Sequence, residues 1–179
     1  MQRILLGVIV VMTLASFWAV IFTGRTKHLS ISLHVAKSER TQLAFGAILG
    51  LATVVTAFIF FTWLLPKYGA GTVSYFMFIL VTTCLGVVAA VPHVIDTWRE
   101  PVHNIAAWGL VYVIIVTMIV MLFWPLPEIA WWTGLGLTAA NSIFLLLAFT
   151  MKHLRQWFLY FQMAYLGVFL SFLLVSAYA

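Results

Sequence analysis

Residues 104–124, NIAAWGLVYVIIVTMIVMLFW, contain no Asp, Glu, Lys or Arg, and this stretch decides the fold class. It is long enough to cross the hydrocarbon core of a bilayer, which requires about 20 mostly apolar residues. In hydrocarbon a helix satisfies the hydrogen-bonding groups of its own backbone, so helix is the expected conformation of a spanning segment. We therefore predict that 104–124 is a transmembrane helix.

Charge-free stretches of similar length lie on both sides of it. Of the 179 residues, 65% are hydrophobic and 7% are charged, whereas soluble domains contain about 25% charged residues. This composition excludes a soluble globular protein. We predict an all-α fold, a single domain over 1–179 and a bundle of six transmembrane helices near 4–23, 42–65, 73–92, 104–124, 129–150 and 157–178.

The basic residues are distributed unequally between the two faces of the membrane. Alternating spans place the links 24–41, 93–103 and 151–156 on one face, here called the polar face. Seven of the nine Lys and Arg residues lie on this face, at Arg25, Lys27, Lys37, Arg40, Arg99, Lys152 and Arg155, against Arg3 and Lys67 opposite. The positive-inside rule predicts that the polar face is cytoplasmic and both termini are outside. Because the basic residues are scattered at span ends, the net charge of +5 does not indicate a nucleic-acid partner.

The link between the third and fourth spans is the first candidate site. The stretch 92–109, PHVIDTWREPVHNIAAWG, places His93 at the end of one span and His103 at the start of the next. Two imidazoles can begin a zinc or non-haem iron site, and His28 or His34 could add a third. The spacing matches no established metal motif. The alternative is that these residues solvate the helix ends, where histidine is tolerated.

Two carboxylates lie between the histidines of this link. Asp96 and Glu100 are four residues apart and share one face of a helical turn, as do Asp96 and Arg99. Either carboxylate is a candidate general acid or base. An Asp96–Arg99 ion pair in a surface loop is the alternative.

The link between the first and second spans, 24–40, is the second candidate site. Its sequence is GRTKHLSISLHVAKSER, and apolar side chains alternate with Ser30, Ser32 and His34. Alternation with a period of two predicts an extended segment, which would lie across the mouth of the bundle. Ser30 and Ser32 are conceivable nucleophiles with a histidine as base. There is no Gly-x-Ser-x-Gly elbow, so an interfacial connector is the alternative.

Within the predicted spans, the polar residue that stands out is Asn141. We expect its amide to bond to another helix, because an amide in hydrocarbon requires a partner. Gly46 and Gly50 form a Gly-x-x-x-Gly motif, for which packing inside the bundle is the expected role. No acidic or basic residue lies in the middle of a predicted span, which argues against a proton pump.

Several stretches resemble a known family. They are SISLHVA at 30–36, ERTQLAFGAILG at 39–50 and the pair GVVAAVPH and VHNIAAWG at 86–93 and 102–109. They resemble the six-span Frag/DRAM/Sfk family of membrane proteins and its bacterial relatives, in which a histidine followed by small residues opens the fourth span. His103, Asn104, Ala106 and Ala107 match that pattern. The resemblance implies lipid handling and places the polar loops on the non-cytoplasmic side. The expected location is a prokaryotic plasma membrane.

The leading hypothesis is a membrane protein that binds or organises lipid at its polar face. Basic side chains attract anionic lipid headgroups, and the candidates are Arg25, Lys27, Arg40, Lys152 and Arg155. One alternative is a metal-dependent intramembrane hydrolase that uses His93, His103 and either His28 or His34 with zinc or iron. Another is a small-solute transporter. Whether the chain is an enzyme, and its oligomeric state, stay open.

Overall fold

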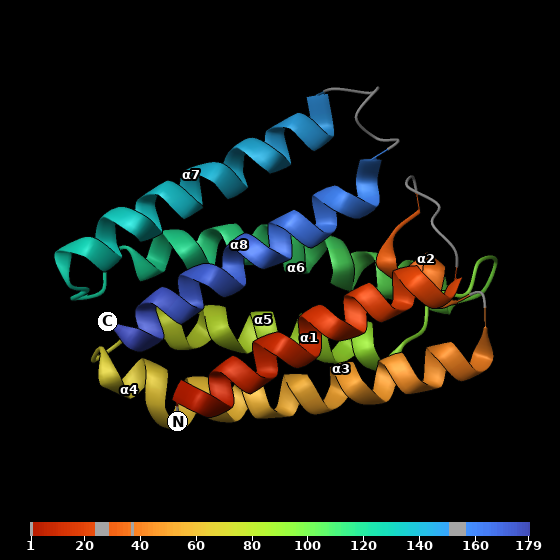
Figure 1. Cartoon of the computed structure of the whole chain (residues 1–179), viewed down its shortest axis with the longest axis horizontal. Coiled ribbons are helices and arrows are strands. Elements are labelled where there is room, and N and C mark those ends of the chain that lie inside the picture. Colours follow the sequence, from red (N-terminus) through yellow and green to blue (C-terminus); the bar gives the residue numbers. More distant parts are fainter. Residues whose placement is uncertain (1, 24–28, 37, 151–156) are drawn as a thin grey trace.

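The computed structural model describes residues 2–23, 29–36, 38–150 and 157–179, and this part of the chain is all-α, as predicted (Figure 1). The elements are α1 (Gln2–Thr23), α2 (Ile31–Val35), α3 (Glu39–Ile59), the π-helix η1 (Phe60–Leu64), α4 (Leu65–Lys67), α5 (Thr72–Ala90), α6 (Arg99–Met121), α7 (Glu128–Thr150) and α8 (Phe158–Tyr178). Within these described ranges, five helices are long and apolar enough to cross a membrane: Glu39–Lys67, Thr72–Ala90, Arg99–Met121, Glu128–Thr150 and Leu159–Tyr178. An integral membrane protein is therefore indicated.

The long helices form a ring. Going around it, α1 packs against α3, α3 against α5, α5 against α6, α6 against α7, α7 against α8, and α8 against α1. Figure 1 shows the helices running along one common direction, with α4 and both chain ends at one end of the bundle and α2 at the other. The end that carries α2 and the loop 91–98 is called the polar end below. This arrangement agrees with the alternating order of spans.

Helix α6 begins at Arg99, five residues before the predicted start at 104. The Glu100 carboxylate accepts a hydrogen bond from the backbone N–H of Asp96 at 2.9 Å, and the Thr97 hydroxyl accepts one from Arg99 N–H at 3.3 Å. Pro101 is tolerated in this first turn because its missing N–H would have no partner there. His103 consequently lies within the helix rather than in the link.

Helix α3 continues into a wider π-turn at Phe60–Leu64. Pro66 follows two residues later. In a regular helix its ring would clash with the carbonyl four residues earlier. The wider turn, in which Leu65 N–H bonds to the Phe60 carbonyl, accommodates this proline without ending the helix.

The prediction of an extended segment over 29–35 is wrong, because Ile31–Val35 is the short helix α2. The Ser30 hydroxyl caps it by accepting a hydrogen bond from Leu33 N–H at 3.2 Å. Ile31 and Val35 are four residues apart on one face and pack with Leu159 of α8. The alternating pattern predicted the wrong conformation because this segment is stabilised as a helix by the Ser30 cap and by contact with α8, and the pattern contains neither.

The end of the bundle opposite α2 is closed by polar and aromatic contacts. The Lys67 ammonium donates to the carbonyls of Ser176 and Ala177 at 3.3 and 3.2 Å, and the Tyr68 hydroxyl also donates to the Ser176 carbonyl. These bonds satisfy carbonyls at the C-terminus of α8, where a cation is also favoured by the helix dipole. The Trp124 indole is buried here and donates to the Ser74 hydroxyl at 3.0 Å.

The contacts inside the bundle test the predictions made for Asn141 and for the motif of Gly46 and Gly50. Asn141 is fully buried, and its amide donates to the Met118 sulfur of α6 at 3.3 Å, so the expected bond to another helix is confirmed. At Gly46 an added Cβ would lie 3.0 Å from the Ala89 carbonyl oxygen, so α3 approaches α5 closely there. Nothing lies within 4 Å of a Cβ at Gly50, so only the first glycine of the motif is needed for packing.

Gly134→Ala should destabilise the bundle. A Cβ at Gly134 of α7 would overlap the ring of Phe172 of α8, which is fully buried. We expect a loss of about 1–3 kcal/mol in the free energy of unfolding, as for other overpacked cores. Thermal unfolding in detergent, followed by circular dichroism, measures it.

Gly136→Ala is the matched control on the same helix, because nothing lies within 4 Å of its Cβ. There the better helix propensity of alanine should leave stability unchanged or slightly higher. Equal melting temperatures for the two variants would contradict the α7–α8 packing described here.

Candidate functional site

A cavity of about 310 Å³ lies inside the ring of helices and reaches the polar end. Its lining changes along its length. Most of its polar side chains lie toward the polar end, where Ser30, Ser32, His93, His103, Asn104 and Gln162 line it together with apolar Ile31, Leu33 and Phe45. Toward the middle of the bundle it is lined by apolar ones, including Met12, Leu49, Leu85, Leu110, Ile114, Leu145 and Leu166. The cavity therefore suits an amphiphile rather than a purely polar or purely apolar ligand.

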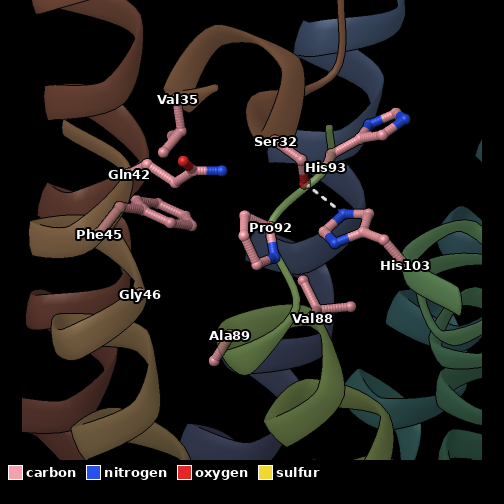
Figure 2. Close-up of a pocket in the computed structure, with 10 residues that line it drawn as sticks. All are labelled: Ser32, Val35, Gln42, Phe45, Gly46, Val88, Ala89, Pro92, His93 and His103. Atoms are coloured by element: carbon pink, nitrogen blue, oxygen red, sulfur yellow. Dashed lines mark hydrogen bonds between the residues drawn. The ribbon is translucent and has the colours of Figure 1, made fainter. Parts of the chain in front are cut away.

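His103 is held in one orientation by two hydrogen bonds. Its Nδ1 lies 2.6 Å from the Val91 carbonyl oxygen, and its Nε2 lies 2.9 Å from the Ser32 hydroxyl. A carbonyl can only accept, so Nδ1 carries the proton and donates. In the neutral ring Nε2 then accepts from the hydroxyl of Ser32. Figure 2 shows this bond crossing from α2 to α6.

His93 lies beside His103 on the loop that follows α5. The two imidazole rings are stacked, with centroids 5.1 Å apart and an interplanar angle of 12°. The Nε2 atom of His93 is buried and has no hydrogen-bond partner among the described residues. An unsatisfied buried nitrogen is uncommon in proteins and marks a place where a bound polar group would be stabilised.

A smaller hollow of about 20 Å³ adjoins the same residues (Figure 2). Ser32, His93 and His103 line both it and the large cavity, and Gln42 of α3 adds an amide to the small one. The other lining residues are mostly apolar, and a space of this volume with a few polar groups in its walls is large enough for one water molecule. The Ser32–His103 pair thus lies between a large amphipathic cavity and a water-sized hollow.

Helix α2 is fastened in place by α8. The Gln162 side-chain oxygen accepts a hydrogen bond from the backbone N–H of Ile31 at 3.1 Å. Contact of Ile31 and Val35 in α2 with Leu159 of α8 adds apolar packing. These contacts position Ser32 over the cavity. The sequence interpretation missed Gln162, although an amide in the apolar stretch 158–170 was a signal of the same kind as Asn141.

The predicted metal ligands are brought together only in part. His93 and His103 are adjacent, whereas His34 is fully buried on α2 with its Nδ1 2.9 Å from the Ser30 carbonyl oxygen. His28 lies outside the described residues. Among the residues that the structure does describe, no group of three His, Cys, Asp or Glu side chains is placed to hold a metal ion. The described donor set therefore does not fit a zinc or iron centre.

The carboxylates lie apart from the histidine pair. Asp96 is exposed, and Glu100 is half-buried and bonded to the Asp96 backbone. Neither lines the cavity. Asp96 and Arg99, both in the described part of the chain, form no ion pair with each other, and the Arg99 guanidinium lies over the Trp98 ring instead. A general acid or base role for either carboxylate stays a prediction.

Of the five predicted headgroup-binding residues, Arg40 lies in the part of the chain that the structure describes. Arg40 is exposed in the first turn of α3 at the polar end. Arg25, Lys27, Lys152 and Arg155 lie outside the described residues.

Comparison of the chain with protein-family models, with curated proteins and with solved structures gives no match. The geometry of the cavity is therefore the basis for assigning a function.

Gln162→Leu should loosen α2. The substitution leaves the Ile31 N–H without its acceptor, and an unsatisfied buried donor costs about 1–3 kcal/mol. Hydrogen–deuterium exchange of a peptide covering 29–36, in lipid nanodiscs, should become faster by about tenfold or more. Gln162→Glu keeps an oxygen acceptor at this position and is the control. Unchanged exchange in Gln162→Leu would contradict the role given to this bond.

Proposed function

We propose that the protein spans the membrane six times and binds a membrane lipid in the cavity, with an acyl chain along the apolar part and the headgroup at the polar end. The sixth span of this proposal is α1, which has 22 residues and a length of about 33 Å. That length matches the hydrocarbon core of a bilayer. The lining of the cavity, which is largely apolar and has most of its polar side chains at one end, is the observation that carries the proposal.

An acyl chain can reach the cavity from the side. Figure 1 shows α7 diverging from α6 toward the polar end. In this region the cavity is lined by Ala107 and Trp108 of α6 and by Phe144 and Ala148 of α7. The ring of Trp108 meets that of Phe149 at a centroid distance of 5.4 Å, so aromatic side chains bridge the two helices here. Small rotations of these rings would admit a chain from the surrounding bilayer.

The distribution of charge favours an anionic headgroup on the cytoplasmic side. Seven of the nine basic residues belong to the predicted polar face. Each contributes about 1 kcal/mol of attraction to an anionic lipid surface. The resemblance of 30–36, 39–50, 86–93 and 102–109 to the Frag/DRAM/Sfk family is consistent with lipid handling. Its opposite orientation of the polar loops is the alternative to the cytoplasmic placement.

A photoactivatable lipid tests occupancy of the cavity. The probe is a phosphatidylglycerol with a diazirine near the end of one acyl chain, in nanodiscs of phosphatidylcholine. We expect cross-links to cavity residues such as Leu110, Ile114 and Leu145. Ala107→Phe places a ring in the cavity and displaces several methylenes worth about 0.8 kcal/mol each, so cavity cross-linking should fall by at least about tenfold.

Ile105→Phe is the matched control, because Ile105 is two residues away on α6 and is 74% exposed toward the surroundings of the bundle. It should leave the cavity cross-links unchanged. Cross-links found only on outward-facing residues such as Ile105 and Ile119 in the wild type would refute the proposal.

The charge contribution has a separate test. Arg40→Gln removes one positive charge at the polar end, so the preference for phosphatidylglycerol over phosphatidylcholine in competition with the probe should fall by about fivefold, equivalent to about 1 kcal/mol. Arg3→Gln removes an exposed charge at the opposite end and is the control. Equal effects of the two substitutions would contradict headgroup binding at the polar end.

A further inference from the structure

A series of hydrogen bonds at the polar end of the cavity joins groups that are suited to catalysis as well as to binding. It runs from the Ser32 hydroxyl to His103 Nε2, at 2.9 Å, and from His103 Nδ1 to the Val91 carbonyl oxygen, at 2.6 Å. We propose that Ser32 is a nucleophile activated by His103 and that it cleaves a carboxylic ester of the lipid bound in the cavity. This inference rests on the proposed function, because the cavity supplies the substrate.

His103 has the arrangement of a general base. The Val91 carbonyl fixes Nδ1 as the protonated nitrogen, which leaves the lone pair of Nε2 directed at the hydroxyl of Ser32. A serine is activated in this way when a base lies within about 3.2 Å and a third group orients that base. The imidazole is also 3% exposed, so its orientation is maintained by packing as well as by hydrogen bonds.

Ser32 is placed where a substrate can meet it. Its side chain lines the large cavity and is half-buried. It is not needed to cap α2, because the Ser30 hydroxyl performs that role. An amphiphile with its chain in the apolar part of the cavity therefore has the bond next to its headgroup near Ser32.

His93 and the small hollow supply the remaining requirements of the reaction. The buried Nε2 of His93 has no partner among the described residues and can donate a hydrogen bond to an ester carbonyl oxygen as negative charge develops on it. The hollow of about 20 Å³ is lined by Ser32, Gln42 and His103 and has room for the water that the second step consumes.

The reaction balances in two steps. In the first, Ser32 Oγ bonds to the carbonyl carbon of the ester while its proton moves to His103 Nε2. The carbon–oxygen bond to the lipid alcohol then breaks, and the departing oxygen takes that proton, leaving an acyl-Ser32. In the second, water gives its proton to Nε2 and bonds to the acyl carbon. Ser32 leaves, recovers the proton, and a fatty acid is released.

An alkyl fluorophosphonate tests the nucleophile directly, because it phosphonylates activated serines and releases fluoride. The full chain in phosphatidylcholine nanodiscs is incubated with a decyl fluorophosphonate, and peptide mass spectrometry locates the adduct. We expect one adduct per chain, on Ser32. It should be absent in Ser32→Ala and reduced by about a hundredfold or more in His103→Gln, as for loss of a general base. Ser171→Ala, at an exposed serine of α8 that does not line the cavity, should label normally.

Cross-linking by the diazirine lipid, measured on the same variants, reports whether the cavity is intact. Loss of the adduct with retained cross-linking in Ser32→Ala and His103→Gln supports the dyad. Retained cross-linking in the wild type without any adduct on Ser32 overturns the dyad and leaves lipid binding standing. An adduct on Ser32 without cavity cross-links supports the nucleophile and refutes the lipid-binding function. Absence of both overturns both.

Discussion

The interior of a bilayer offers no hydrogen-bond partners to a protein, and the rest of this structure depends on that constraint. Along the long helices many hydroxyls meet it locally: those of Thr53, Thr117 and Thr138 each donate to the carbonyl four residues earlier, at 2.7 to 2.8 Å. At the polar end the backbone becomes irregular, and local bonds no longer suffice. There α2 obtains its acceptor from Gln162 of α8, and His103 of α6 obtains one from the Val91 carbonyl. The polar groups of the candidate site are gathered by this need for partners.

The two ends of the bundle use different means to close the space between the helices. At the end opposite α2, Tyr68, Phe78 and Trp124 stack on one another in the core, with ring centroids 5.2 and 5.8 Å apart. At the polar end, the small helix α2 and two imidazoles occupy the same position over the ring but pack less completely. The cavity lies beneath these smaller groups. The lipid-binding proposal and the role proposed for Ser32 both rest on this polar cap over an apolar interior.

Much of the fold was predictable because a spanning helix is specified by length and absence of charge, which are local properties. The predicted spans match α3, α5, α7 and α8 to within about three residues at most ends. Asn141 was predictable for the same reason, since a single amide in an apolar run needs a partner. The site was harder, because Ser30 and Ser32 are equivalent in the sequence and are distinguished only by contacts with Leu33 and His103. Proximity of His93 to His103 followed from the short link, whereas the Val91 carbonyl carries no sequence signal.

The ring of helices is closed by its first and last members, since α1 packs against α8. During synthesis α8 enters the membrane after the other helices of the ring, so the wall between α7 and α1 is missing until then. Under the proposed function, chains from the surrounding bilayer would enter the interior through that interval, because an empty apolar space of this size is unfavourable. The arrival of α8 brings Gln162 to α2 and, under that proposal, would enclose the lipid present at that time. A lipid-binding cavity would thus receive its first occupant from the membrane in which the chain is assembled.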